Sequence, residues 1–462
     1  LSAMNSGITS DKITEMETEI DGKQTQLTEK QLEAVNSGVN ANLISQIPDH
    51  EQRITKLEGL FPDTIVYGFH IDPNESDPSK AVTYLSQAVG MVPAKMGANA
   101  FDYGSWGNAF FMPKPCMLKY DGTVDYYLDP NDYTKKADGT ASDVANLEYE
   151  GNAMMEWGKV YYKFASGGTD GECYFYVSNH KIDETYNCWC NIDCDGNDID
   201  HFYTAIYNGT IPSRSDNMRS MSGIQLTTGV NGGVAITNEM EKAKANNTTS
   251  KDEWGLELYS DRMLITALLI LMGKSLDSQS VFGNGLTKDN ADKTSKISYI
   301  TGDMNTKGLF YGSTSSMLEP VKVFGMENYW GLAWRKIIGC LCVDGHLKTK
   351  LTYSTDDGSS GTGYNLTGVG YVDEGIALST SGFIKSMKFS ERGFTPLNTD
   401  GASSTYWCDY YINRTPGTFQ LMVGGDTSAA VGGGAFEINL ALSIDNLAEK
   451  VASSLSCKAI KK

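Results

Sequence analysis

Turn-forming dipeptides constrain the fold of this chain more than any other feature. Glycine occurs 48 times among 462 residues, and Asp-Gly or Asn-Gly pairs recur at residues 121–122, 195–196, 208–209 and 231–232. Such pairs readily adopt the left-handed backbone of tight hairpin turns. Tyrosine, with 25 residues, outnumbers phenylalanine, with 16, which is typical of domains with many amphipathic contact surfaces. The body of the chain is therefore predicted to consist of short strands joined by tight turns.

The spacing of apolar residues predicts the elements of this body. Thr64–Gly68 is predicted to be its first strand, and Glu156–Phe164 and Glu172–Ser178 are aromatic-rich segments typical of half-buried strands. Asp252–Met272 is predicted to be one helix, because its apolar residues recur at helical spacing. Asn328–Ile338 fits either a helix or a strand. The predicted fold class is α+β, with one or two helices packed against twisted antiparallel sheets.

The N-terminal part, residues 1–62, differs in character from the body, residues 63–462. Its apolar residues follow a broken heptad pattern with shifts in register, which predicts short coiled-coil segments with stutters. One helix alone cannot bury such a narrow apolar seam, so self-association is expected, and a helix packed on its own domain is the alternative. The heptad positions are Ile13, Met16, Ile20, Leu27, Leu32, Val35, Val39, Ile54, Leu57 and Phe61.

Charge and hydropathy exclude several classes of partner. Hydrophobic residues make up 40% of the chain and charged residues 21%, which is enough to bury a sizeable core. The formal net charge is −19, and no basic stripe is present, so nucleic acid is not an expected partner. The best apolar run, Met263–Met272, is shorter than the about 20 residues of a membrane-spanning helix, so membrane insertion is not expected.

Two segments contain residue types that bind metals, but neither has the required spacing. Asp193–Asp198 places three aspartates around a glycine turn, yet no glutamate occupies the twelfth position of an EF-hand loop. Cys188–His201 contains three cysteines and a histidine, in spacings that match no structural zinc module. Motifs for nucleotide binding, serine hydrolysis and zinc proteolysis are absent. We therefore expect no metal and no cofactor.

The segment Ser403–Arg414 has the composition of a binding surface. It reads SSTYWCDYYINR, with four aromatic residues among short polar ones and no clear burial period. Tyrosine and tryptophan provide large, rigid contact area at a small entropy loss, and the short polar residues adapt their hydrogen bonds. A second patch, Asp426–Ala430, lies between two glycine-rich strand ends. A buried aromatic strand is the alternative interpretation of the first segment.

Several longer segments resemble the tail-fibre or receptor-binding proteins of phages and prophages, especially those of gut bacteria. Residues 28–47 resemble their coiled-coil stalk repeats, and residues 151–164, 255–285 and 321–339 resemble blocks of their body. The closing segment, residues 423–457, resembles that of C-type-lectin-fold domains of the formylglycine-generating-enzyme type. The variable proteins of diversity-generating retroelements use the same variant of the fold.

This resemblance implies an attachment protein of the virion tail, commonly trimeric. A coiled-coil stalk, residues 1–62, would carry a C-type-lectin-like domain with insertions, residues 63–462, at the tip. The implied partners are a bacterial surface receptor, either protein or glycan, and other tail proteins that contact the stalk. No enzymatic activity is expected. A tail-borne glycan depolymerase and a structural adaptor that docks another virion protein are the alternatives.

The resemblance also implies which residues bind the receptor. In the diversified members of the family, the binding residues lie upstream of a Val-Gly-Gly strand end and in the loop just after it. These positions coincide with the two patches chosen from composition. The predicted ligand-binding residues are Thr405, Tyr406, Trp407, Asp409, Tyr410, Tyr411, Asn413, Arg414, Asp426, Thr427 and Ser428.

Overall fold

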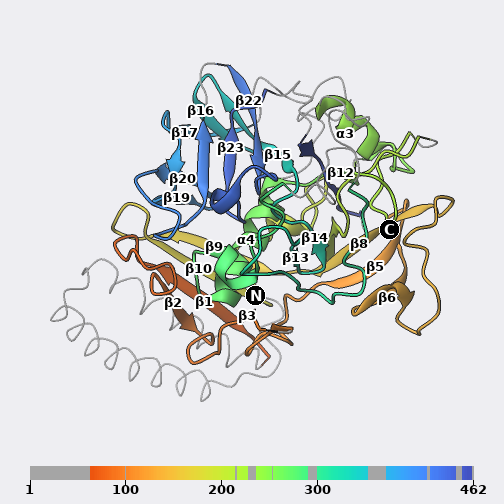
Figure 1. The fold of residues 1–462 in the computed structure, drawn as a ribbon, viewed down its shortest axis with the longest axis horizontal. Helices are drawn as coiled ribbons and strands as arrows, with labels where there is room; N and C mark the ends of the chain where they lie inside the picture. Colours follow the sequence, from red (N-terminus) through yellow and green to blue (C-terminus); the bar gives the residue numbers. More distant parts are fainter. Residues whose placement is uncertain are drawn as a thin grey trace, which may run out of the picture.

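The protein, seen in a computed structural model, is built mainly from strands. The structure describes residues 63–98, 100–213, 216–226, 236–251, 253–289, 299–351, 371–413, 417–443 and 450–459. Strands account for 37% and helices for 10% of the structure. The described strands form three large sheets and three two-stranded ones, which surround the long helix α4 (Figure 1).

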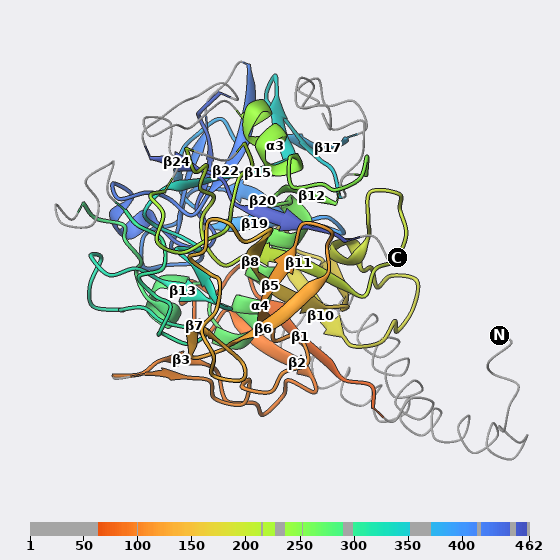
Figure 2. The same ribbon diagram turned by 90° about the vertical axis from the view of Figure 1, so that its right-hand side faces the viewer.

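The first large sheet is antiparallel and contains the start of the described chain. Strand β1 is an interior strand, because it pairs with β2 on one side and with β10 on the other. Figure 2 shows β1 and β2 on the side of the molecule opposite to β22 and β17. In sheet order, the strands are β2 (Val82–Ser86), β1 (Val66–Ile71), β10 (Cys173–Ser178) and β9 (Tyr161–Ser166).

The second large sheet has seven strands and joins the middle of the chain to its C-terminal part. Its C-terminal strand, β25, lies between β12 and β11, and pairs antiparallel with both. In sheet order, the strands are β12 (Trp254–Leu256), β25 (Leu455–Cys457), β11 (His201–Ala205), β8 (Gly151–Gly158), β5 (Lys114–Lys119), β6 (Val124–Asp129) and β7 (Asp132–Lys136).

The third large sheet has eight strands, and both C-terminal patches chosen from the sequence adjoin its strands β21 and β22. Beyond its main order, β24 (Val451–Ala452) pairs in parallel with β15. In sheet order, the other strands are β17 (Val372–Ile376), β16 (His346–Thr349), β15 (Trp334–Val343), β22 (Thr418–Val423), β23 (Ile438–Leu440), β21 (Tyr410–Asn413) and β18 (Gly382–Phe383).

Short hairpins and helices complete the described fold. The hairpins are β3 (Lys95–Met96) with β4 (Phe101–Asp102), β13 (Lys322–Val323) with β14 (Met326–Glu327), and β19 (Ser386–Ser390) with β20 (Gly393–Asn398). The helices are α3 (Ile236–Lys244), α4 (Tyr259–Gly273) and α5 (Ser278–Phe282), with 3-10 turns η2 (Trp189–Asn191) and η4 (Ala430–Gly432). Among the described residues, no helix is long and apolar enough to cross a bilayer.

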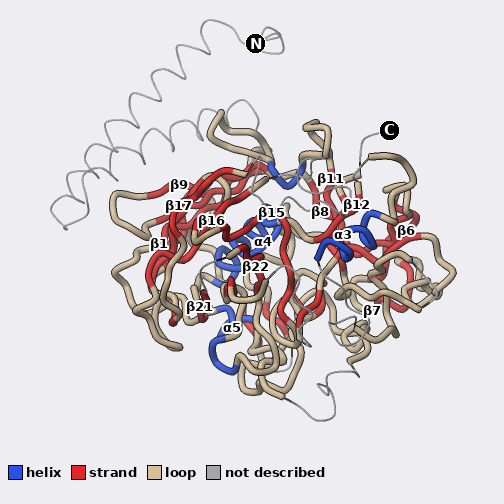
Figure 3. Tube along the Cα trace, turned by 90° about the horizontal axis from the view of Figure 1, so that it is seen from above, coloured by secondary structure: helices blue, strands red, loops and turns tan. Residues whose placement is uncertain are grey.

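Helix α4 lies at the centre of the molecule, and all of its residues are buried. It is apolar on nearly every side, as expected of a helix that is enclosed rather than laid on a surface. Its two charged residues are paired in the interior: Asp261 Oδ1 lies 2.8 Å from Lys458 Nζ, and the Arg262 guanidinium lies 3.7 Å from Glu257. Figure 3 shows α4 enclosed by strands of the surrounding sheets.

Two side-chain amides fix the start of the described chain. The side chain of Asn179 accepts a hydrogen bond from the backbone NH of residue 65 at 2.8 Å and donates one to the carbonyl of residue 63 at 2.9 Å. The side chain of Gln87 accepts from the NH of residue 66 at 2.8 Å and donates to the carbonyl of residue 64 at 3.4 Å. The backbone that enters β1 is therefore bonded on two sides before the ladder begins.

The predicted fold class is wrong. An α+β body with a C-type-lectin-like domain is not what the structure shows, because the described part of the chain is mostly β-sheet. The predicted helix begins only at Tyr259, since residues 254–256 form β12 and pair with β25. The predicted strand Glu156–Phe164 is interrupted at residues 159–160, where the chain passes from β8 in the seven-stranded sheet to β9 in the four-stranded sheet. The predicted stalk, residues 1–62, lies outside the described residues.

Two local predictions are confirmed, and one open alternative is decided. The first strand of the body is β1, and the segment Glu172–Ser178 contains β10. The segment that fits either a helix or a strand, Asn328–Ile338, contains the start of strand β15. These elements were predictable because their apolar and aromatic residues face the interior within the element itself.

Candidate functional site

The two C-terminal patches meet at one end of the eight-stranded sheet. In that sheet β23 lies between β21, its parallel neighbour, and β22, its antiparallel neighbour. Tyr411 is level with Ile438, and Val423 is level with the same residue. The residues before β21, those after β22 and those before β23 must therefore gather at the same end. We call this end, formed by residues 401–410 and 424–437, the C-terminal rim.

Direct contacts join the two halves of the rim. The backbone NH of Phe436 donates a hydrogen bond to Asp409 Oδ2 at 2.7 Å. Gly432 lies against Tyr410 so closely that an added Cβ would stand 3.0 Å from the Tyr410 Cβ. The structure thus brings together the segments that the sequence predicted as one binding surface.

Four of the predicted binding residues reach the surface of the rim. Ser428 is exposed, and Thr405, Tyr406 and Tyr410 are half-buried. The Tyr410 ring meets the half-buried ring of Phe383 edge-on, with centroids 5.1 Å apart. The neighbouring Val431 is exposed, although it is apolar. The accessible part of the rim therefore combines aromatic edges with hydroxyl groups, which is a composition typical of contact surfaces.

A cation lies over one of these rings. The ammonium group of Lys385 stands 5.4 Å from the centroid of the Tyr406 ring. Cation–π contacts at partly exposed sites contribute roughly 0.5–1 kcal/mol. This contact limits the positions that the Tyr406 ring adopts at the rim.

Two aromatic residues predicted to bind are core residues instead. Trp407 is 1% exposed and packs against Phe389, Phe394 and Phe436, with ring centroids 5.0–6.1 Å away. Tyr411 is also 1% exposed, and its hydroxyl donates to the carbonyl of residue 378 at 3.1 Å. Their burial corresponds to the alternative interpretation of this segment, and neither ring is open to a surface ligand in this structure.

The remaining predicted residues that the structure describes are buried polar residues. Asp426 is buried, and its carboxylate accepts a hydrogen bond from the Ser428 backbone NH at 2.7 Å. Thr427 is buried, and its hydroxyl bonds to Asp289. Asp409 and Asn413 are buried as well. Arg414 lies outside the described residues.

The rim loops contain strained backbone. Tyr406, Cys408 and Ala430 have φ values of 59°, 60° and 52°, in the left-handed region that costs residues with a Cβ roughly 1–2 kcal/mol each. Backbone hydrogen bonds hold them there, for example from Tyr406 NH to the carbonyl of Ser76 at 2.8 Å and from Ala430 NH to the carbonyl of Thr287 at 2.8 Å. Loops fixed in this way lose little entropy on binding a ligand.

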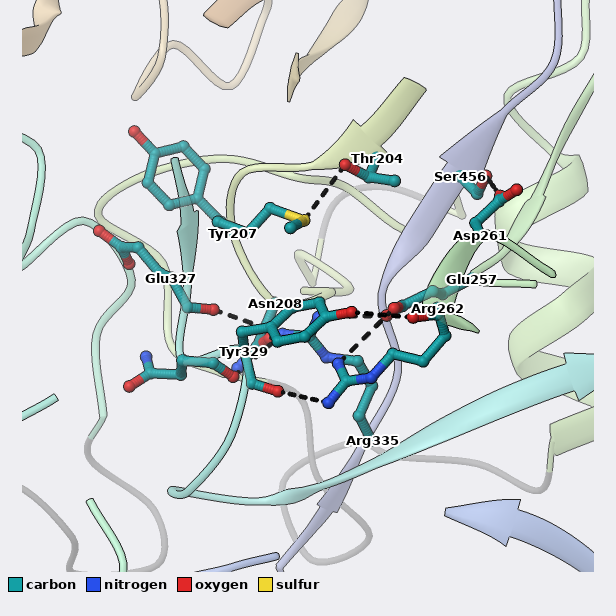
Figure 4. Close-up of polar contacts among 12 residues, drawn as sticks. Thr204, Tyr207, Asn208, Glu257, Asp261, Arg262, Glu327, Tyr329, Arg335 and Ser456 are labelled. Atoms are coloured by element: carbon teal, nitrogen blue, oxygen red, sulfur yellow. Dashed lines mark hydrogen bonds and ion pairs between the residues drawn. The ribbon is translucent and has the colours of Figure 1, made fainter. Parts of the chain in front are cut away.

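A buried polar network supports the rim from beneath. Arg335 is level with Val423 at the rim end of the sheet, and its guanidinium bonds to Glu257 Oε2 at 3.1 Å. The Arg262 guanidinium lies 3.5 Å above the Tyr329 ring and donates to the Tyr329 carbonyl at 3.0 Å. Figure 4 shows these groups converging from α4, β15 and the segments that precede them. The network therefore joins the central helix to the rim end of the sheet.

A small cavity lies on one face of the same sheet. Its volume is about 60 Å³, and its walls are mainly apolar, with Leu421, Ile438, Leu440 and Phe394 among them. The Tyr259 hydroxyl, also in the wall, donates to the carbonyl of residue 394 at 3.0 Å. Pockets for drug-sized ligands are about 300–1,000 Å³. The cavity is too small for a whole ligand of that size.

Two aspartates of the segment Asp193–Asp198 are engaged by other protein groups. Asp193 Oδ1 accepts hydrogen bonds from the backbone NH of Asp195 at 2.9 Å and of Asn197 at 2.8 Å. The carboxylate of Asp195 pairs with Lys251 at 2.6 Å. Within the described ranges, no cluster of three or more histidine, cysteine, aspartate or glutamate side chains has the arrangement of a metal site.

Sequence reasoning missed one residue of the rim and one residue that packs against it. Phe383, on β18, meets Tyr410 only because β18 and β21 pair at long range. Glu437 is a buried carboxyl at the base of the rim, preceded by the run Gly432–Gly434. An acidic residue beside a glycine run was the available signal, since glycines allow the backbone to approach a side chain closely.

Comparison with known proteins gives no family for this chain: no protein-family model and no curated protein matches it.

Proposed function

We propose that this protein attaches a phage or prophage virion to a bacterial surface, and that its C-terminal rim contacts the receptor. One observation carries the proposal: the rim loops present half-exposed aromatic rings and hydroxyl groups, and their strained backbone is held by hydrogen bonds above buried residues. Rigid loops that present tyrosine and serine suit recognition of a large partner. The proposal includes location in the tail, a homotrimeric assembly and contact with other tail proteins, all of which follow from the resemblance of the sequence.

The chemistry of the rim favours binding over polymer cleavage. A glycan hydrolase uses two carboxyl groups that both reach the scissile bond. The two carboxyl groups at the base of the rim, Asp409 and Glu437, are 0% and 2% exposed. A polymer cannot reach them while the rim keeps this structure. We therefore assign no enzymatic step to this site.

The test compares binding of labelled protein to a panel of intact gut bacteria. The informative variant is Tyr406→Ala with Tyr410→Ala, because both rings are half-exposed and neither forms the core. Loss of two contact aromatics is expected to weaken binding about 10- to 100-fold or more. The matched control is Tyr127→Ala, since Tyr127 is 40% exposed on the seven-stranded sheet.

Two outcomes decide the proposal. Native binding that is lost in the double variant and kept in the Tyr127→Ala control supports attachment through the rim. Equal binding by the native chain and the double variant contradicts the assigned surface. Substituting Trp407 or Tyr411 is not informative, because their rings are packed in the core and their loss would destabilise the fold.

A further inference from the structure

Two enclosed carboxyl groups lie at the base of the rim. Asp409 is 0% exposed and Glu437 is 2% exposed. Asp409 Oδ2 accepts a hydrogen bond from the Phe436 NH, but Asp409 Oδ1 and Glu437 Oε2 have no hydrogen-bond partner. A buried, ionised carboxylate without a partner costs several kcal/mol, so such a group takes up a proton instead.

The surroundings of this pair are acidic. The carboxylate of Asp277, ahead of α5, raises the pKa of Asp409, and that of Asp426 raises the pKa of Glu437. The cation that acts on Asp409 is Arg262 of α4, which is already engaged by Glu257 and by the Tyr329 carbonyl. Among the described residues, no ion pair reaches either carboxyl group.

Burial and these like charges act in the same direction. Burial raises the pKa of Asp409 well above its usual range, and the nearby Asp277 adds to this effect. Burial also raises the pKa of Glu437, with further contributions from Asp409 and Asp426. Burial therefore favours the neutral form of both groups while the rim is closed.

Glycines of the rim loops close directly over the pair. A Cβ added to Gly434 would overlap Asp409 Oδ1, and a Cβ added to Gly425 would overlap Glu437 Oε2. These contacts leave no room to hydrate an ionised carboxylate while the loops keep their positions. Ionisation of either group therefore requires residues 424–428 or 432–437 to move, and these loops include Ser428 and the neighbours of Tyr410.

We propose that Asp409 and Glu437 act as a proton-held latch, which keeps the C-terminal rim closed while both are protonated and opens it when they ionise. A carboxyl group whose pKa is higher in the closed form than in the open form stabilises the closed form at low pH. This stabilisation is lost as the pH rises through the folded-state pKa of each group. Attachment is therefore expected to weaken in alkaline solution. This last step rests on the proposed function, whereas the latch itself does not.

Hydrogen exchange measured along the full chain tests the latch without any ligand. Exchange rates of residues 424–428 and 432–437 are divided by their intrinsic rates at each pH, from neutral to alkaline, and are compared with those of β10. In the native protein, rim protection is expected to fall more than ten-fold relative to β10. In the double variant Asp409→Asn with Glu437→Gln, protection should stay constant. The control Asp400→Asn changes an exposed carboxyl group outside the pair, and this variant should behave as the native chain does.

Each outcome separates the latch from the proposed function. Rim protection that does not change with pH in the native protein overturns the latch, and this reading needs no variant to fold. Equal loss of protection in the amide variant overturns it as well. A pH-dependent rim in a protein that binds no bacterium keeps the latch and contradicts the attachment function.

Discussion

At the scale of single residues, some buried charges of this protein are neutralised in ion pairs. Lys336 and Glu239 are 5% and 2% exposed, and their charged atoms lie 2.7 Å apart. Lys181 and Glu184 form a pair at the same distance, but they are largely exposed. The two pairs differ mainly in burial, so they provide a direct comparison of what an ion pair contributes inside and outside the fold.

We expect Lys336→Met to lower the free energy of unfolding by about 3–5 kcal/mol, because it leaves Glu239 charged and unpaired in the interior. Lys181→Met should change it by less than about 1 kcal/mol. Burial already raises the pKa of Glu239, so the cost in Lys336→Met should shrink as the pH falls and Glu239 takes up a proton. Urea unfolding at several pH values measures both effects. An equal cost for the two variants would contradict this argument.

The close approach of a rim glycine to Asp409 also leads to a prediction for a single residue. We expect Gly434→Ala to destabilise the protein by about 1–3 kcal/mol, because its Cβ would overlap Asp409. Gly158→Ala is the matched control, since nothing lies within 4 Å of its added Cβ, and its effect should stay within about 0.5 kcal/mol. Thermal unfolding distinguishes the two, and a neutral Gly434→Ala would show that the loop moves aside at little cost.

At the scale of elements, local pattern predicted some boundaries and failed at others. Helix α4 was predictable, because the spacing of its own apolar residues indicates a buried helix. Its start was not, because residues 254–256 are held as a strand by β25, which comes from the far end of the chain. The fold class failed for the same reason. Most of this molecule consists of short strands that pair over long sequence distances. A short stretch of sequence does not show which distant strand it will pair with.

The edge strand β17 carries an element-scale prediction. It ends the strand order of the eight-stranded sheet in the described part of the chain, and its Ile376 is 81% exposed. Exposed apolar edges promote pairing between copies. Ile376→Lys should therefore reduce self-association at high concentration, measured by light scattering, without lowering the unfolding midpoint. Val89→Lys, at an exposed residue outside any strand, should leave self-association unchanged.

At the scale of the whole molecule, the candidate site could be predicted only in part. Composition selected two segments that lie together at one end of a sheet. It could not assign Trp407 to the core, because the rings that enclose it come from β19, β20 and the loop before β23. Which side chains of a loop face outward depends on elements that the loop itself does not specify.

Net charge sets a prediction for the molecule as a whole. With a formal charge of −19, the folded chain repels itself more than the expanded chain does. Added sodium chloride screens this repulsion between exposed groups. The unfolding midpoint should therefore rise between low and physiological ionic strength. A midpoint that falls with added salt would show that attractive surface pairs outweigh the repulsion.

The amide contacts of Asn179 and Gln87 determine how the body would respond to a pulling force on its first described residues. A pull applied to the backbone ahead of residue 63 first reaches these hydrogen bonds and then strand β1, which is flanked by β2 and β10. Force directed along an interior strand stretches both ladders in shear, so their bonds must break together rather than one after another. The entry to the body is thus built to transmit tension into the sheet before it yields.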